Sequence, residues 1–390
     1  KPLEVKWKGV QTMAVLDKFR SVVEDRHRYA SEWKAATGRK VMGYLCTYLP
    51  DEMIYATGNL PVRILGSHEP QDVSERHIFS KWCPCSRDFL AQGLLGRYDY
   101  LGGILQGHCC IHMKQTYVSW CRHLDPGYSY DLYVPPSLHT PMALANLARS
   151  LEELRLSLEE ESGTALTPEV IRSALDVYDT NRRLLRDIYD LRKQDNPSIT
   201  GAEAMEVVLA TMVMDKREAN TWLEELLAEL KGKPPNPKEG GDGKPRLMLI
   251  GSGNDDISFL HLLDSLGLGV VVDEHCIGTR YFWNTTPDGA DPVAAIADRM
   301  IAKPPCPNKD LAEKRRMAFL QELTRDFRVQ GVIVMQQKFC DPHQWDAPDI
   351  KATMDRAGIP TLFLESDIVV PVGQFRTRVE AFAEMMEIGV

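Results

Sequence analysis

Two pairs of closely spaced cysteines have the strongest chemical potential in this sequence. Cys83 and Cys85 flank a proline in "CPCSRDF", and Cys109 and Cys110 are adjacent in "GHCC". Thiolates can form disulfides, bind soft metal ions or act as redox groups. The chain has nine cysteines, and no two of them have the Cys-x-x-Cys spacing that is typical of structural zinc sites. The spacing of these pairs is therefore less consistent with a structural zinc site than with the other roles of thiols.

Composition limits the classes of protein that this chain can be. Its 46 basic and 55 acidic residues give a net charge of -9, and scattered basic residues exclude nucleic acid as a partner. We expect no membrane contact, because no apolar stretch reaches about 20 residues and "KPLEVKWKGV" lacks a signal peptide's apolar core. A cytoplasmic protein is expected. Thiols stay reduced in that compartment, which favours metal or redox roles over disulfides.

Hydrophobic patterning predicts the α/β fold class, with two Rossmann-like parallel-sheet domains and a helical segment between them. We expect a helical lead at 1–40 and an N-terminal α/β domain at 41–138, since "KVMGYL" and "YDYLGGILQG" look like strands. Leu, Glu and Arg at helical spacing predict a helical domain at 139–233. A linker rich in Pro, Gly and Lys at 234–245 precedes a C-terminal α/β domain at 246–390.

Several cysteines follow directly after predicted strands, where the carboxyl ends of parallel strands gather ligands. They are Cys46, Cys109, Cys110, Cys276 and Cys340. Each one alone is equally consistent with a small buried hydrophobic residue. As a set, widely separated thiolates can hold an iron–sulfur cluster and leave one iron open for substrate.

The segments around these cysteines resemble one protein family. In order, "GYLCTYLPDEMIYATGNLPVRILG", "CPCSRDFL", "GHCC", "KFCDPHQWDAPDIKATMDRAGIPTLFLESD" and "VGQFRTRVEAFAEMM" look like motifs of the 2-hydroxyacyl-CoA dehydratase and ATP-dependent benzoyl-CoA reductase family. The similarity runs from about residue 41 to near the end of the chain. It implies a subunit of an anaerobic iron–sulfur enzyme that passes single electrons to a CoA thioester.

The resemblance implies a four-iron (4Fe-4S) cluster held by Cys83, Cys110 and Cys340. A one-residue shift in matching would exchange Cys83 for Cys85, or Cys110 for Cys109. A relative of the family holds a larger double-cubane cluster, and further cysteines could serve such a site here. They are Cys46, Cys85, Cys109 and Cys121.

The extra cysteines in "CPCS" and "HCCI" look most like the smaller, gamma-type substrate-side subunit of benzoyl-CoA reductase. That resemblance implies reduction of an aromatic-ring CoA thioester, benzoyl-CoA, to a cyclic diene. It also implies a homologous substrate-side subunit, an ATP-hydrolysing iron–sulfur activator and ferredoxin as upstream donor. The sequence has no P-loop motif, so ATP is expected to be hydrolysed by a partner. The alternatives are a 2-hydroxyacyl-CoA dehydratase subunit and a non-catalytic structural partner.

Other residues are candidates for roles around the cluster. His108 and His112, beside the second predicted ligand, are candidate proton donors, or else solvated or capping histidines. Arg376 and Arg378 are candidates for binding CoA phosphates, although a helix surface in which Arg376 pairs with Glu380 fits equally well.

"LMLIGSGNDD" followed by Asp273 imitates a dinucleotide-binding unit, but the third glycine is replaced by Asp256. An ordinary turn with a helix cap is favoured, and the loop could instead face the cluster or the thioester. His275 and Cys276 are adjacent on an extended segment, so we do not expect them to act as a catalytic pair.

Overall fold

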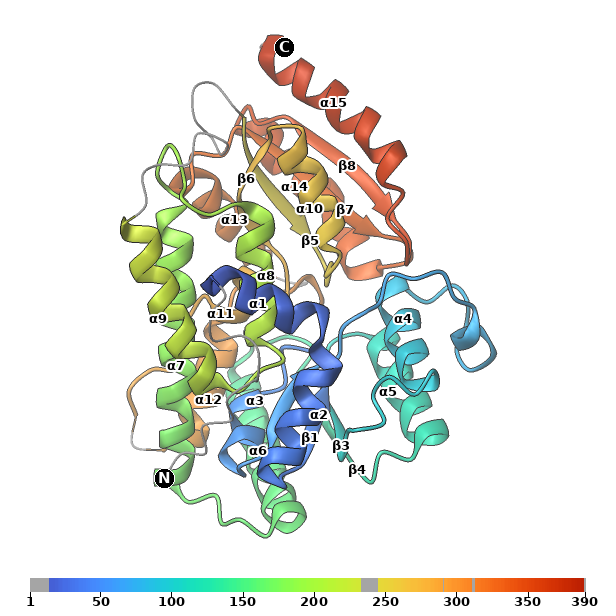
Figure 1. Cartoon of the computed structure of the whole chain (residues 1–390), viewed down its shortest axis with the longest axis vertical. Coiled ribbons are helices and arrows are strands. Elements are labelled where there is room, and N and C mark those ends of the chain that lie inside the picture. The colour runs from blue at the N-terminus through green and yellow to red at the C-terminus, as the bar shows by residue number, and fades with distance from the viewer. Residues whose placement is uncertain (1–13, 233–244, 290, 311–312, 389–390) are drawn as a thin grey trace.

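The computed structural model of the chain describes residues 14–232, 245–289, 291–310 and 313–388. Two four-stranded sheets form its centre, and every strand pairing is parallel. In Figure 1 the C-terminal sheet lies above the N-terminal sheet, and helices run along both. The predicted α/β class is confirmed, with two Rossmann-like sheets. Nearly all of the predicted linker at 234–245 lies outside the described residues.

The N-terminal sheet has the order β2-β1-β3-β4. Its strands are β1 (Val41–Tyr44), β2 (Leu60–Arg63), β3 (Gly103–Gly107) and β4 (Tyr128–Leu132). The helices in this half are α1 (Val15–Glu24), α2 (Arg26–Thr37), α3 (Asp51–Ala56), η1 (Val73–Arg76), α4 (Pro84–Leu94) and α5 (Ile111–Leu124). The strands β1, β2 and β3 are buried throughout, as expected of a parallel sheet that is covered on both faces.

Four helices follow in the range predicted to be helical. They are α6 (Pro141–Ser162), α7 (Pro168–Leu191), α8 (Gly201–Thr211) and α9 (Lys216–Gly232). Local sequence explains where two of them begin. The Thr167 side chain caps α7, and Thr200 forms a capping box with Glu203 at the start of α8.

The C-terminal sheet has the order β6-β5-β7-β8. Its strands are β5 (Arg246–Gly251), β6 (Gly269–Glu274), β7 (Gly331–Gln337) and β8 (Thr361–Ser366). The helical elements are α10 (Ile257–Ser265), α11 (Thr279–Phe282), α12 (Pro292–Ala302), η2 (Pro307–Lys309), α13 (Arg315–Asp326), α14 (Asp341–Arg356) and α15 (Val372–Ile388). Both sheets therefore have the same strand order, with the third strand beside the first.

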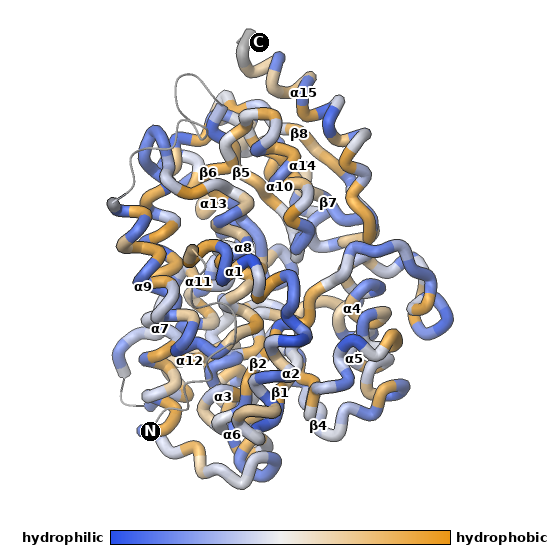
Figure 2. Tube along the Cα trace, viewed as in Figure 1, coloured by the Kyte–Doolittle hydropathy of each residue, from blue (hydrophilic) through white to orange (hydrophobic). Residues whose placement is uncertain are grey.

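Packing joins the segments into a continuous body. One apolar core combines α1, α8 and α9 with the C-terminal sheet, and Figure 2 shows hydrophobic residues along the strands of that sheet. A second core combines the N-terminal sheet with α6 and with α12, a helix that comes much later in the chain. The predicted boundaries 41–138, 139–233 and 246–390 stay predictions, and contacts cross them at both cores.

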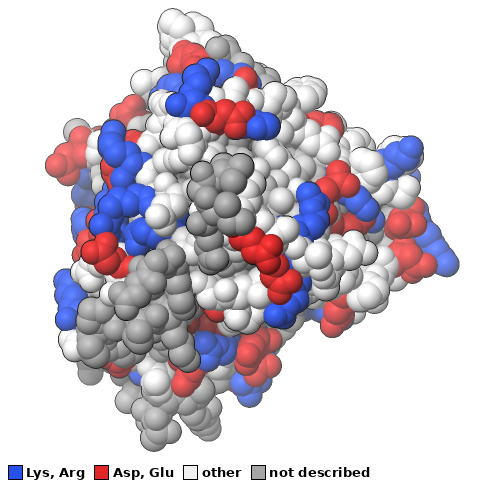
Figure 3. Space-filling model, turned by 90° about the horizontal axis from the view of Figure 1, so that it is seen from above, with Lys and Arg blue, Asp and Glu red and all other residues white. Residues whose placement is uncertain are grey.

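The helices and the surface charges bear on the possible partners of the chain. No helix in the described ranges combines the length and the apolar character needed to cross a bilayer. On the face in Figure 3, Lys and Arg side chains are interspersed with Asp and Glu side chains. The described residues of this face therefore offer no extended basic stripe of the kind that binds nucleic acid.

Candidate functional site

A cavity of about 90 Å³ lies where the two halves of the chain meet, and eight of the nine cysteines line it. Those from the N-terminal half are Cys46, Cys83, Cys85, Cys109 and Cys110, and those from the C-terminal half are Cys276, Cys306 and Cys340. All nine cysteines are among the described residues and are free of disulfide bonds. The cavity is therefore a preassembled set of thiols drawn from both sheets.

The strand order explains why these residues meet. In an open parallel sheet, ligands bind beyond the carboxyl ends of the strands, at the point where the connections reverse direction. That point lies between β1 and β3 in one sheet and between β5 and β7 in the other. The loops after these four strands contribute Cys46, Cys109, Gly253 and Cys340 to the cavity wall. The two switch points thus face one another across the thiols.

The three cysteines predicted as cluster ligands share a local position. Cys83, Cys110 and Cys340 are the N-cap residues of α4, α5 and α14, respectively. A proline in the first turn helps α4 and α14 to begin there. The partial positive charge at a helix N-terminus stabilises a nearby anion, including a thiolate. The structure brings all three into one cavity, while their role as ligands stays a prediction.

The other predicted cysteines divide into two groups. Cys46, Cys85 and Cys109 line the cavity, whereas Cys121 lies on α5 outside its lining, beside Tyr117. The cavity wall also includes two cysteines that were not predicted as ligands, one after a strand and one after a helix. They are Cys276, which follows β6, and Cys306, which follows α12 in "AKPPCPN". The position of Cys276 after a predicted strand could have indicated its place in the cavity. No pattern of the sequence indicates a site at Cys306.

Two glycines allow the backbone to come close to this site. A Cβ atom at Gly107 would lie 2.4 Å from the carbonyl carbon of Tyr48, so only glycine lets β3 pass the loop that carries Cys46. A Cβ at Gly253 would lie 3.4 Å from Cys276 Sγ and 3.5 Å from Cys85 Sγ. The Gly253 loop is therefore part of the cavity wall, between thiols of the two halves.

Burial and contact between thiols favour the protonated form of most of these cysteines in the chain by itself. Burial raises the pKa of Cys83, Cys85, Cys306 and Cys340. Contact with the Cys109 thiol, together with burial, raises the pKa of Cys46. Because thiolates rather than thiols bind metals, loading of this cavity would release protons.

The cavity does not have the form of a site for a single metal ion. Within the ranges that the structure describes, no three or more His, Cys, Asp or Glu side chains converge to hold one ion. The thiols are instead spread around the wall of the cavity. The chemistry of a donor set of thiols is that of an iron–sulfur cluster, in which each iron takes only one thiolate from the protein.

The two predicted proton donors lie near the cavity without lining it. His112 is buried, its Nδ1 accepts a hydrogen bond from the backbone N–H of Cys83 at 3.2 Å, and its ring lies 4.3 Å from that of Trp82. Burial lowers the pKa of His112 and of His108, which is partly buried after β3. The histidine in the cavity wall is His343, and burial lowers its pKa well below the usual range. Sequence reasoning missed His343.

The predicted CoA-binding arginines lie on the exposed surface of α15. Arg376 Nε donates to Glu380 at 2.9 Å, and Arg378 donates to the carbonyl of Phe363 at 2.8 Å. Neither residue lines the cysteine cavity. The geometry of Arg376 is that of the alternative interpretation, a surface pair of residues four apart on a helix.

The glycine-containing loop after β5 is an ordinary turn with a helix cap. The Asp256 side chain accepts a hydrogen bond from the N–H of Ser258 at 2.9 Å and so caps α10. Asp273, which imitated a ribose-binding acid, is buried and accepts hydrogen bonds from Tyr189 Oη at 2.5 Å and from the Thr279 N–H. His275 is buried, and its ring nitrogens have no hydrogen-bond partner among the described residues.

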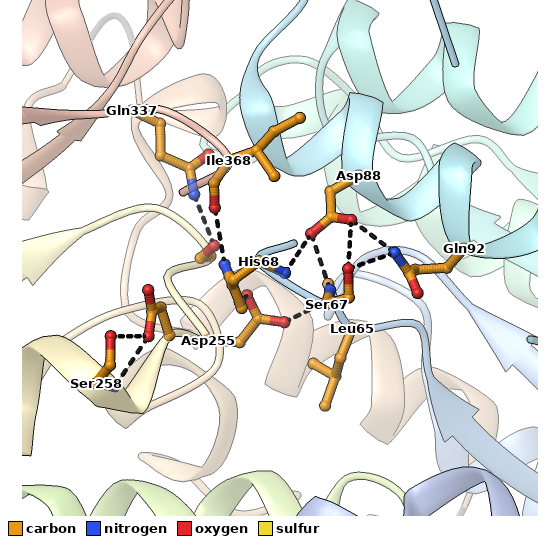
Figure 4. Close-up of polar contacts among 12 residues, drawn as sticks. Leu65, Ser67, His68, Asp88, Gln92, Asp255, Ser258, Gln337 and Ile368 are labelled. Carbon is orange, nitrogen blue, oxygen red and sulfur yellow. Dashed lines mark hydrogen bonds and ion pairs between the residues drawn. The ribbon is translucent and has the colours of Figure 1, made fainter. Parts of the chain in front are cut away.

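A polar clamp fixes the Gly253 loop to the N-terminal half (Figure 4). His68 Nε2 lies 2.9 Å from the Asp255 carboxylate, which also accepts the N–H of Gly66 at 2.7 Å. Gln337 donates to the carbonyl of Gly253 at 2.9 Å. Burial would lower the pKa of His68, but Asp255 outweighs it and raises the pKa to about 9. Burial would raise the pKa of Asp255, but His68 outweighs it and lowers that pKa to about 2.

Comparison with known proteins agrees with this architecture. The family described as "2-hydroxyglutaryl-CoA dehydratase, D-component" matches residues 46–386, so the chain belongs to that family. The (R)-phenyllactyl-CoA dehydratase beta subunit of Clostridium sporogenes is 26% identical over 94% of this chain and 97% of its own length. A benzoyl-CoA reductase subunit of Thauera aromatica is 26% identical over 82% of this chain and 83% of its own length.

A third relative widens the range of activities. The (R)-2-hydroxyglutaryl-CoA dehydratase subunit beta of Acidaminococcus fermentans is 25% identical over 96% of this chain and 99% of its own length. These relatives are thus subunits of dehydratases or of a reductase that act on CoA thioesters. The chain is about equally identical to the dehydratase subunits and to the reductase subunit, so these identities do not decide between the two activities.

Proposed function

We propose that this chain is the iron–sulfur subunit of an ATP-dependent benzoyl-CoA reductase that delivers low-potential electrons to an aromatic CoA thioester. The observation that carries this proposal is the buried cavity lined by eight thiols from both halves of the chain. Thiolates are the ligands that hold iron–sulfur clusters.

The number of thiols supports a cluster larger than a single cubane. Cys83, Cys110 and Cys340 satisfy a three-ligand four-iron cluster, and five further cysteines line the same cavity. A double-cubane group would use both sets. When bound, such a cluster supplies electrons one at a time at low potential.

The residues of the chain supply the environment for that chemistry. The N-termini of α4, α5 and α14 direct their partial positive charge toward Cys83, Cys110 and Cys340. Buried apolar neighbours such as Leu45 and Met113 line the cavity and exclude water. His112 holds the Cys83 backbone through its Nδ1, so its Nε2 carries the proton of the neutral ring. The roles of His108 and His112 as donors of a proton to the reduced substrate ring stay predictions.

The reductase reaction consumes electrons, whereas the dehydratase reaction recycles them. Reduction of benzoyl-CoA to a cyclic diene takes two electrons and two protons into the product. A larger cluster suits this stoichiometry, because it can store more than one electron. A 2-hydroxyacyl-CoA dehydratase subunit is the second candidate, and it is favoured by matches over nearly the full length of two dehydratase subunits.

Exposed apolar side chains near the three N-cap cysteines support a partner at this edge. Phe79 and Trp345 are 61% and 66% exposed, and Ile111 and Phe339 are also exposed. These residues lie within five positions of one of the three N-cap cysteines in the sequence. Exposed aromatic residues of this kind are typical of protein interfaces. The proposed partners are a homologous substrate-side subunit and an ATP-hydrolysing activator that receives electrons from ferredoxin.

Metal analysis of matched cysteine variants tests the proposal. The wild-type chain, Cys340→Ala and Cys121→Ala are purified without oxygen, and iron and sulfide per chain are measured. We expect Cys340→Ala to lose most of its iron and Cys121→Ala to keep it, because Cys121 lies outside the cavity. A Cys340→Ala variant with wild-type iron content would refute the ligand assignment.

The substrate is tested with the assembled complex and a limiting amount of reductant. We expect two electrons to be consumed for each benzoyl-CoA converted. Many turnovers of a 2-hydroxyacyl-CoA per electron, with no conversion of benzoyl-CoA, would establish the dehydratase instead.

A further inference from the structure

Two buried basic side chains border the thiol cavity without an acidic partner among the described residues. Arg63 at the end of β2 is 3% exposed, and Lys303 just after α12 is 4% exposed. Both line the cavity. A charge taken out of water is costly unless another charge or strong hydrogen bonds compensate it. The surroundings of each side chain therefore show what compensates it.

Arg63 has weak polar contacts for a buried guanidinium. Its Nη1 donates to the Tyr44 carbonyl at 3.4 Å, and its Nε has no hydrogen-bond partner among the described residues. The rings of Tyr44 and Phe89 lie 5.7 and 5.5 Å from the guanidinium carbon. In the part of the chain that the structure describes, no Asp or Glu lies within ion-pair distance of it. Aromatic faces alone do not replace an anion at this depth.

Lys303 is in a similar position on the other half of the chain. Its Nζ donates to the Thr47 carbonyl at 2.7 Å and lies 4.9 Å from the centre of the Tyr48 ring. No described carboxylate forms an ion pair with it. Burial lowers the pKa of Lys303 to about 8, and the interaction with Cys46 opposes that shift. An anion in the cavity would therefore favour the charged form of Lys303.

A third cation on the cavity wall provides a contrast. Arg280 also lines the cavity, but its Nη1 lies 2.8 Å from Glu274, and its Nη2 donates to the Gly251 carbonyl at 2.7 Å. Its charge is therefore balanced by the protein itself. Arg63 and Lys303 instead add two uncompensated positive charges to the wall. The thiols of Cys46 and Cys276 face both side chains, and Lys303 also interacts at longer range with Arg299 and with the Asp51 carboxylate.

We propose that Arg63 and Lys303 are positioning residues that neutralise an anionic thiolate centre in this cavity and raise its reduction potential. This inference rests on the proposed iron–sulfur function and names the residues that tune it. A positive charge nearby favours the state with one more electron, so removal of the charge makes the centre harder to reduce. Burial strengthens the effect, because solvent screens the charges very little there.

A redox titration followed by electron paramagnetic resonance tests this role. We compare wild type, Lys303→Met, Lys303→Arg and a matched control, Lys216→Met. Lys216 is a buried lysine outside the cavity lining, and its charge interacts chiefly with Asp51 and Arg182. At the wild-type midpoint potential, we expect the reduced-to-oxidised ratio in Lys303→Met to fall about tenfold, a shift of about 59 mV for one electron. Lys303→Arg and Lys216→Met should keep the wild-type midpoint.

Arg63→Met provides a second variant, with Arg63→Lys as its conservative control, should Lys303→Met fail to fold. The same negative shift is expected in Arg63→Met, with recovery in Arg63→Lys. Iron content and thermal melting are measured for every variant. Wild-type potentials in the charge-removing variants that retain iron would overturn this inference alone. A wild-type chain without iron would overturn the proposed function as well, so the two failures are distinguishable.

Discussion

The two parallel sheets share one strand order but contribute different parts to the site. The N-terminal half supplies five thiols, including two of the three N-cap cysteines, Cys83 and Cys110. The C-terminal half supplies three thiols, the Gly253 backbone and the basic residues Arg280 and Lys303. The N-terminal half is therefore richer in thiols, the C-terminal half adds the Gly253 backbone, and both add positive charge, since Arg63 lies at the end of β2. A single topology can provide either part, because the loops after the strands, rather than the strand order, carry most of the side chains that line the site.

The two halves also differ in the contacts that hold their parts of the cavity wall in place. The C-terminal loop with Gly253 is held by the His68–Asp255 clamp and by Gln337, whereas the N-terminal cysteines are fixed by helix starts. A change in the clamp should loosen the cavity without removing a thiol. A change at Gly253 should fill the cavity without affecting the clamp.

The largest effect is expected from Gly253→Leu. Its Cβ would lie 3.4 Å from Cys276 Sγ and 3.5 Å from Cys85 Sγ, and we expect the rest of the side chain to enter the cavity that Gly253 lines. We expect bound iron to fall by more than half, with the thermal melting temperature nearly unchanged. Gly373→Ala on α15, where the added Cβ would meet no atom within 4 Å apart from its chain neighbours and the adjacent helix backbone, is the control. Full iron loading of Gly253→Leu would show that the loop does not face the cluster.

Loss of the clamp should give the next largest effect. His68 has a φ of 59°, a conformation that asparagine tolerates, so His68→Asn removes the charge with little backbone strain. We expect the free energy of unfolding to fall by about 3 kcal/mol, because the Asp255 carboxylate stays buried without its partner. Denaturant unfolding measures this change. An unaltered midpoint would mean that the clamp does not join the two halves.

The same clamp gives the stability a defined pH dependence. The pKa of His68 is raised to about 9, so its contribution is complete below about pH 6.5 and is lost as pH rises toward 9. The pKa of Asp255 is lowered to about 2, so its contribution is complete above about pH 4 and is lost on acidification. We expect wild type to lose more stability than His68→Asn between pH 6.5 and 9. Parallel pH profiles for the two proteins would contradict this assignment.

The smallest effect is expected at the exposed surface of α15. Arg376→Ala removes a pair with Glu380 whose two side chains are about half exposed, so stability should change by less than about 0.5 kcal/mol. The KM for the CoA thioester should stay within about twofold of wild type, as expected for a surface ion pair. A large increase in KM would restore the CoA-phosphate role that the sequence indicated.

Much of the fold could be predicted because its signals are local. Continuous apolar runs such as that of β5 indicate buried parallel strands, and strand ends marked Cys46, Cys109 and Cys340 as candidates for one edge. The resemblance added Cys83. The approach of the two sheet edges has no local signal, since it depends on helices that pack across both halves. Lys303 and Cys306 were missed for that reason.

The central claim is that both halves of the chain hold one iron–sulfur cluster in the cysteine cavity. Native mass spectrometry of the intact chain, purified without oxygen, tests it directly. We expect a mass increase that corresponds to a single cluster with more than about four irons, and we expect Cys276→Ala to reduce the cluster mass while Cys121→Ala leaves it unchanged. A wild-type mass equal to that of the polypeptide alone would contradict the claim.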